Sequence, residues 1–289
     1  VTTPVPPEGS AVADQAGPGM LETLSGLVRR PMEMARGAAG DAIDSLRNPI
    51  DTAQSIARQV LVTDRSKSPL WAGRRSVGRR FEVFSASLPA VKAAGRKLGV
   101  TVNDVYVAAV VAGAAAYHED FAEAVDEFRV SIPISTRTDR SMGGNDFAPA
   151  RVVLPVVPGD PAGQVAGVHD ALAAVKSERS LQLAGALAGL VSSLPSPLLV
   201  RLARQQVETV DFACSNVRGA PFDLYVAGAQ VLANHPFGPT AGTAFNATLL
   251  SYRDNLDVGL NIDTGAVEDP TRLREHIAAA LADIVAAAS

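Results

Sequence analysis

The sequence contains very little cysteine, few aromatic residues and only a small net charge. A single cysteine in 289 residues excludes a disulfide scaffold and a structural zinc site built from cysteine thiolates. Aromatic residues make up 5% of the chain and the formal net charge is -4. Neither the stacking surface nor the basic surface of a nucleic-acid-binding protein is therefore expected. The composition predicts no metal site and no nucleic-acid partner.

The common catalytic signatures are absent as well. The chain has no Walker P-loop, no GxSxG nucleophile elbow, no CxxC pair and no HExxH helix. A general base has to be oriented and has to reach its substrate. The four histidines are isolated from one another in sequence. His118 is expected at a polar helix end, His169 on the solvent face of a helix, His235 in a loop and His276 in the terminal helix. The sequence predicts no catalytic residue in this chain.

Composition divides the chain into three parts. Residues 1–18 are rich in proline and glycine and predict a flexible tail. Residues 19–78 show helical spacing interrupted by prolines and predict a helical linker. From residue 79 onward strand-like and helix-like segments alternate, so residues 79–289 are expected to form one lobe. Basic residues exceed acidic ones between residues 28 and 80, which suits either a solvated linker or contact with an anionic surface.

Apolar periodicity predicts the elements of this lobe. Strands are expected over residues 81–87, 129–135, 148–157, 210–215, 223–231, 243–251 and 256–262. Helices are expected over residues 88–98, 101–117, 161–178, 181–192, 197–207 and 270–287. The last helix has an apolar inner face formed by Leu273, Ile277, Leu281 and Ile284. The sequence thus predicts an α/β lobe with a mixed β-sheet and flanking helices.

Local signals mark several helix ends. Gly99 is expected to end a helix, since glycine adopts the left-handed conformation of a helix C-terminus without strain. Thr101 and Asp104 have the spacing of a capping box. Asp160 and Asp269 each precede a proline, which predicts an N-cap followed by the first helical residue.

Membrane and targeting signals are weak. The longest uncharged run, residues 181–200, approaches the length of a membrane span, but prolines and polar residues interrupt it. A buried or interfacial helix is the alternative interpretation. The N-terminus lacks the apolar segment of a secretory signal. The chain starts with valine, which indicates either an unusual start codon or a fragment of a longer protein.

Five short segments resemble, in order, the second half of the bacterial wax ester synthase/diacylglycerol acyltransferases. They are GVTVNDV at 99–105, VSIPIS at 130–135 with Arg137, GN at 144–145 with VLP at 153–155, SNVRG at 215–219, and SY at 251–252 with residues 259–263. The resemblance covers residues 65–289. The sequence departs from the family at Arg218, where the family usually has proline.

The resemblance implies a chloramphenicol-acetyltransferase-like fold, also called the CoA-dependent acyltransferase fold. Two such lobes would enclose a tunnel, with residues 19–78 linking them and 79–289 forming the C-terminal lobe. Acyl-CoA would be a substrate, no cofactor would be needed, and the acceptor would be diacylglycerol or a long-chain alcohol. The catalytic histidine of this family belongs to an HHxxxDG motif in the N-terminal lobe, and no two histidines are adjacent in this chain. A partner lobe with that motif is therefore expected, and this segment alone is expected to be inactive.

The same motifs imply substrate-binding residues. Ser215 or Asn216 could donate a hydrogen bond to a tetrahedral oxyanion, or both could serve a turn at a strand end. Asp104 suits helix capping, and Asn103 could hold the neighbouring lobe or line the tunnel. Ser251 and Tyr252 are weaker candidates, with ordinary sheet positions as the alternative. The implied set is Asn103, Asp104, Ser215, Asn216, Ser251 and Tyr252.

Two other functions stay open. One is a non-catalytic pseudo-subunit that binds a lipid or a partner lobe, because the histidine pair is absent. The other is a polyketide-type or condensation-type acyltransferase with a different acceptor. We expect a cytoplasmic protein, with peripheral contact to a membrane or lipid droplet as a further partner interaction.

Overall fold

A six-stranded mixed sheet forms the centre of the lobe. A computed structural model describes residues 68–73, 75–135, 147–177 and 209–289. The strands lie in the order β1 (Arg79–Ser87), β8 (Asn255–Asp263), β7 (Phe245–Tyr252), β4 (Phe212–Arg218), β2 (Glu127–Ser135) and β3 (Phe147–Pro155). Strand β4 is parallel to β7 and β2, and the other pairs are antiparallel.

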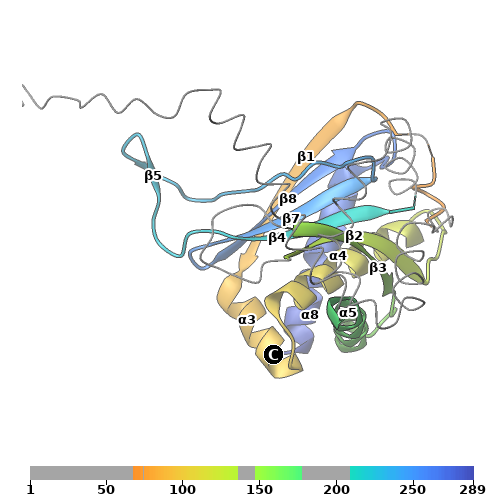
Figure 1. Cartoon of the computed structure of the whole chain (residues 1–289), viewed down its shortest axis with the longest axis horizontal. Helices are drawn as coiled ribbons and strands as arrows, with labels where there is room; N and C mark the ends of the chain where they lie inside the picture. The colour runs from red at the N-terminus through yellow and green to blue at the C-terminus, as the bar shows by residue number, and fades with distance from the viewer. Residues whose placement is uncertain (1–67, 74, 136–146, 178–208) are drawn as a thin grey trace, which may run out of the picture.

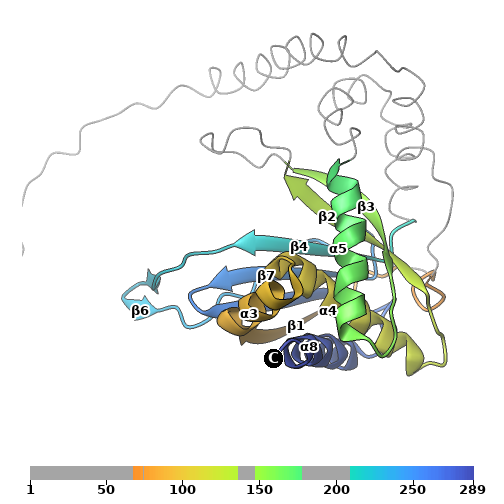
Figure 2. The same cartoon turned by 90° about the horizontal axis from the view of Figure 1, so that it is seen from below.

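Four helices cover one face of this sheet (Figures 1 and 2). They are α3 (Leu88–Leu98), α4 (Val102–Glu119), α5 (Pro161–Ser177) and α8 (Pro270–Ala287). The predicted mixed α/β architecture is confirmed. Within the described residues no single helix is both long and apolar enough to span a membrane. Helices α3 and α4 taken together have the length and composition of a span, but they are bent by 97° at the break between them.

The predicted helix ends are confirmed because their signals are local. Gly99 ends α3 with a φ of 73°. The Thr101 side chain accepts a hydrogen bond from the Asp104 N–H at 3.3 Å, and the Asp104 carboxylate accepts from the Thr101 N–H at 3.0 Å. Asp160 and Asp269 accept hydrogen bonds from backbone N–H groups in the first turns of α5 and α8. Each bond satisfies a donor that a helix start leaves open.

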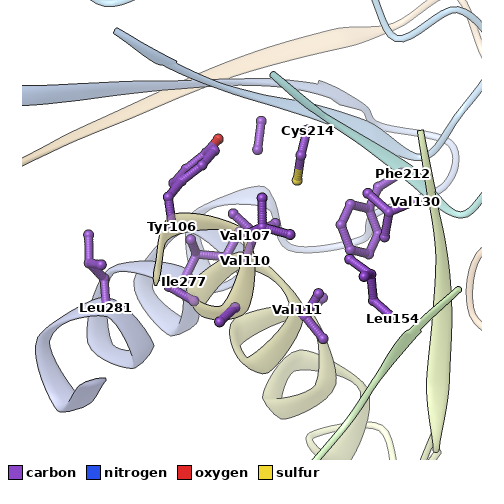
Figure 3. Close-up of a cluster of buried hydrophobic side chains, with 14 of the residues drawn as sticks. Tyr106, Val107, Val110, Val111, Val130, Leu154, Phe212, Cys214, Ile277 and Leu281 are labelled. Carbon is purple, nitrogen blue, oxygen red and sulfur yellow. The ribbon is translucent and has the colours of Figure 1, made fainter. Parts of the chain in front are cut away.

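Helix α4 is the central core helix, enclosed by the sheet on one side and α8 on the other (Figure 3). It crosses α8 closely, since a Cβ added at Gly113 would lie 2.5 Å from the Ile277 Cα. The predicted inner face of α8 is confirmed, because Leu273, Ile277, Leu281 and Ile284 are all buried. Cys214, on β4, is buried in the same core.

The residues just before β1 pack into this core. Trp71 is fully buried and stacks on Phe128, at a ring distance of 5.6 Å. His118 lies in the last turn of α4, so its predicted place at a helix end is confirmed, but its side chain is buried and the expected polar surroundings were wrong. Its Nδ1 donates to the Ala114 carbonyl at 2.7 Å, and its Nε2 therefore accepts from the Ser68 hydroxyl at 2.6 Å. The periodicity around His118 could not show that a distant segment covers it.

The prediction of one strand over residues 223–231 was also wrong. The structure has a short hairpin there, β5 (Tyr225–Val226) and β6 (Ala229–Gln230). Ala227 and Gly228, with φ of 50° and 82°, form the turn that splits the run. The tail, most of the linker, and the predicted helices at 181–192 and 197–207 lie outside the described residues, as does the uncharged run 181–200. The boundary at residue 79 stays a prediction.

Candidate substrate-binding edge

The last residues of the parallel strands β4 and β7 lie side by side and contain four of the residues singled out by sequence. The register pairs Ser215 with Thr248 and Arg218 with Ser251. Asn216 and Tyr252 therefore lie at the same end of the sheet as Ser215 and Ser251. We call this end of β4 and β7, together with the start of α4, the candidate edge.

Asn103 and Asn216 meet at this edge although they are 113 residues apart in sequence. The Asn216 side-chain amide donates to the Asn103 Oδ1 at 3.3 Å. Asn103 is the second residue of α4, and Asn216 is exposed on β4. A primary amide has two N–H groups, so Asn216 keeps a second donor for a ligand.

Asp104, the next residue along α4, is buried. Besides capping Thr101, its Oδ2 accepts a hydrogen bond from the His169 Nδ1 at 2.9 Å. The predicted capping role of Asp104 is confirmed by the first of these bonds. His169 was predicted on the solvent face, and its side chain is 40% exposed, but the bond to Asp104 was missed. No local signal could have revealed it, because 65 residues separate the partners.

The side chains of Ser251 and Tyr252 form hydrogen bonds with the backbone of the segment that follows β4. The Ser251 hydroxyl accepts from the Gly219 N–H at 3.4 Å. The buried Tyr252 hydroxyl accepts from the Leu224 N–H at 3.0 Å and donates to the Val231 carbonyl at 2.9 Å. Both side chains therefore fix backbone near the candidate edge. A direct role in substrate binding stays a prediction for these two residues, as for Ser215.

Structural surroundings strongly shift the pKa values of Cys214 and Asp120. Burial raises the pKa of the Cys214 thiol far above its usual range, so the sulfur is not a nucleophile at neutral pH. Asp120 binds Arg272 and His276, and these hydrogen bonds hold the pKa of its carboxyl far below its usual range. Where the structure describes the chain, no group of three His, Cys, Asp or Glu side chains could hold a metal ion.

Comparisons with known structures define the fold class. The fold resembles a wax ester synthase/diacylglycerol acyltransferase from Marinobacter aquaeolei VT8, with a TM-score of 0.61, 20% identity, and coverage of 83% of this chain and 56% of the other. It also resembles the nonribosomal peptide synthetase FmoA3, with a TM-score of 0.54, 14% identity, and coverage of 82% and 24%. The lobe has the chloramphenicol-acetyltransferase-like fold, as predicted.

Sequence comparisons identify the family. Residues 143–285 match the WS/DGAT C-terminal domain, and residues 1–106 match the wax ester synthase/diacylglycerol acyltransferase catalytic domain. A putative diacylglycerol O-acyltransferase of Mycobacterium tuberculosis is 27% identical over 271 residues, covering 93% of this chain and 54% of the relative. Another from that species is 32% identical over 281 residues, covering 92% and 59%. The chain belongs to the wax ester synthase/diacylglycerol acyltransferase family and spans about half the length of these relatives.

Proposed function

We propose that this chain supplies one lobe of an acyl-CoA-dependent O-acyltransferase that esterifies diacylglycerol or a long-chain alcohol. The family membership and the names of the mycobacterial relatives support an acyl transfer to diacylglycerol. The observation that carries the proposal is the contact between Asn103 and Asn216. Two separate family-like motifs meet there, at an exposed edge where hydrogen-bonding groups can face a substrate.

The catalytic base of the proposed reaction comes from a companion lobe that carries an HHxxxDG motif. A histidine of that motif removes the proton from the acceptor hydroxyl as the oxygen attacks the thioester carbonyl. The tetrahedral oxyanion collapses, the C–S bond breaks, and CoA leaves as a thiol after receiving the proton from the histidine. The products are an ester and free CoA, and no cofactor takes part.

In this mechanism Asn216 donates a hydrogen bond to the oxyanion. Its free N–H is available for that bond, while Asn103 holds the amide in place. Such donors act best when their orientation is fixed before the reaction. Ser215 precedes Asn216 on β4, so its half-buried side chain faces the opposite side of the sheet, and Asn216 is the donor assigned to the oxyanion.

The test compares activity with stability in an Asn216→Ala variant. The full chain is mixed with an HHxxxDG-bearing lobe of the family, palmitoyl-CoA and dioleoylglycerol, and triacylglycerol is measured. Loss of an oxyanion donor should lower kcat by about 10²-fold or more. An exposed side chain with one long hydrogen bond should change the unfolding free energy by less than about 0.5 kcal/mol. Unchanged kcat would remove Asn216 from the mechanism.

Two alternatives give different results in the same assay. A pseudo-subunit would bind the companion lobe or lipid without producing an ester. A condensation-type enzyme would transfer the acyl group to another acceptor, so the assay includes hexadecanol and an amine acceptor beside dioleoylglycerol. If only the amine acceptor were acylated and no ester formed, the proposed ester synthesis would be wrong and the enzyme would be of the condensation type.

A further inference from the structure

A histidine and a buried carboxylate form a pair next to the candidate edge, and the proposed mechanism gives this pair no role. The Asp104 carboxylate on α4, which is 1% exposed, accepts a hydrogen bond from the His169 Nδ1 on α5 at 2.9 Å. A carboxylate offers only acceptors, so the hydrogen of this bond belongs to the Nδ1. Helix α5 packs across α4 on the same face of the sheet (Figure 2), and the pair joins the two helices.

The same carboxylate oxygen also shapes the first turn of α4. The Asp104 Oδ2 accepts from the Thr101 N–H at 3.0 Å, while the Thr101 hydroxyl accepts from the Asp104 N–H at 3.3 Å. Asn103 lies between these two residues in the turn that the reciprocal bonds close. His169 shares the oxygen that makes one of these bonds. It therefore constrains the orientation of the capping carboxylate and, through it, the turn that carries Asn103.

Asn103 passes this constraint to the candidate edge. Its Oδ1 accepts from the Asn216 side-chain amide at 3.3 Å. This distance is longer than that of an ordinary N–H···O bond, so the contact depends closely on where the turn of α4 places Asn103. A small shift of the turn would rotate the Asn216 amide and, with it, the N–H assigned to the oxyanion.

Helix α5 is itself fixed to the end of β3, which makes it a firm support for His169. The buried Gln164 side chain of α5 donates from Nε2 to the Pro155 carbonyl at 2.9 Å, and its Oε1 accepts from the Val157 N–H at 2.8 Å. Hydrogen bonds thus connect the sheet edge at β3 through α5 and α4 to the end of β4.

We propose that His169 is a positioning residue that holds Asp104 and the first turn of α4 so that Asn103 presents the Asn216 amide to the oxyanion; this rests on the proposed function. His169 acts through the bonds of Asp104 and Asn103 and touches no reacting atom. An oxyanion donor stabilises the transition state most when its orientation is fixed beforehand. Loss of the supporting bond should therefore lower kcat and leave KM nearly unchanged.

The imidazole can do this in both of its protonation states. A neutral ring with its hydrogen on Nδ1 and a protonated ring both present the Nδ1–H to Asp104. Positioning therefore does not require His169 to gain or lose a proton, whereas a role as general base would. Asparagine places an amide N–H close to the position of Nδ1, so it can replace the donor but not a base. The variant His169→Asn separates the two roles.

The kinetic experiment uses the full chain with an HHxxxDG-bearing lobe, palmitoyl-CoA and dioleoylglycerol. His169→Ala should lower kcat by about 10-fold or more and change the KM for palmitoyl-CoA by about twofold at most. His169→Asn should keep kcat within about threefold of the unmodified chain and keep the pH profile of kcat. Asp170→Ala is the matched control, because Asp170 is the exposed neighbour of His169 on α5, and it should leave kcat unchanged. Equal losses of kcat in the alanine and asparagine variants would overturn the positioning role.

Nuclear magnetic resonance of the full chain tests the same connection without the companion lobe. The side-chain amide resonances of Asn216, assigned with Asn216→Ala, report on its contact with Asn103. They should shift in His169→Ala and stay in place in His169→Asn and Asp170→Ala. His169→Phe, which keeps a ring without a donor, replaces the alanine variant if that variant does not fold.

Unmoved Asn216 resonances in a folded variant without the donor would overturn the inference, as would shifted resonances accompanied by an unchanged kcat. Absence of ester formation by the unmodified mixture would refute the proposed function. In that case the Asn216 resonances still decide whether His169 sets the orientation of this amide, so the two failures can be told apart.

Discussion

Replacing Tyr252 by phenylalanine tests whether one hydroxyl fixes the root of the β5–β6 hairpin segment, residues 219–232, which we call the arm. The substitution keeps the buried ring and removes only the oxygen that bonds Leu224 and Val231, at 3.0 and 2.9 Å. A hydrogen bond contributes about 1 kcal/mol net, so the arm root should lose about 2 kcal/mol. By the relation of about 1.4 kcal/mol per tenfold change, opening of the arm root should become about 30-fold more frequent.

Amide hydrogen exchange provides the assay, because the Val231 N–H donates within the arm root, to the Leu224 carbonyl. Its exchange should accelerate by up to about 30-fold in Tyr252→Phe. Exchange of the Leu249 and Val258 amides, which lie in the paired strands β7 and β8, should stay as in the unmodified chain. Unchanged exchange at Val231, or equal acceleration in β7 and β8, would refute the assignment of this hydroxyl to the arm.

Three further predictions concern the core and the start of α4. Burial lowers the pKa of His118 below the value of about 6.5 for an unfolded histidine. The unfolded state thus takes up the proton first, so the unfolding free energy should fall as pH drops below about 6.5. Urea denaturation at several pH values measures this dependence. The variant His118→Gln should flatten the slope of unfolding free energy against pH, and an unaltered slope would contradict the assignment. Ile277→Ala should destabilise by about 2–5 kcal/mol, whereas the exposed Glu275→Ala on the same helix should change stability little; equal effects would argue against the packing of α8. Thr101→Ala should lower the unfolding free energy by about 1 kcal/mol, because it removes the oxygen that accepts the Asp104 N–H, and Thr101→Ser should retain the bond and the stability. An unchanged unfolding free energy in the alanine variant would show that the cap is dispensable.

Local chemistry made the helix ends predictable from sequence. The capping box of Thr101 and Asp104 and the cap at Asp269 involve residues three positions apart, so their spacing alone indicates the bond. The strands expected over residues 243–251 and 256–262 leave only a short connection between them, and β7 and β8 are joined there by a tight turn at Arg253 and Asp254. These signals depend on the immediate neighbours in the chain and hardly on the rest of the fold.

Long-range contacts could not be predicted in the same way. The bonds of His118 to Ser68 and of Asp104 to His169 join residues 50 and 65 positions apart, and no periodicity links such partners. The pair of Asn103 and Asn216 was approached only through a resemblance, which named both residues without predicting that they touch.

The arm shows a different limit of pattern reading. An alternating run over residues 223–231 is compatible with one long strand and with a short hairpin. The left-handed turn at Ala227 and Gly228 decides between them. Gly228 was the available signal for that turn, and its position in the middle of the run is what an unbroken strand disfavours.

The measurement that tests the account most directly is ester formation by the recombined lobes. Radiolabelled palmitoyl-CoA and dioleoylglycerol are incubated with the chain alone, with an HHxxxDG-bearing lobe alone, and with both. The account predicts labelled triacylglycerol only in the mixture, and its loss when the histidines of that motif are replaced by alanine. Triacylglycerol made by the chain alone, or a mixture that remains inactive although the lobes bind each other, would contradict it.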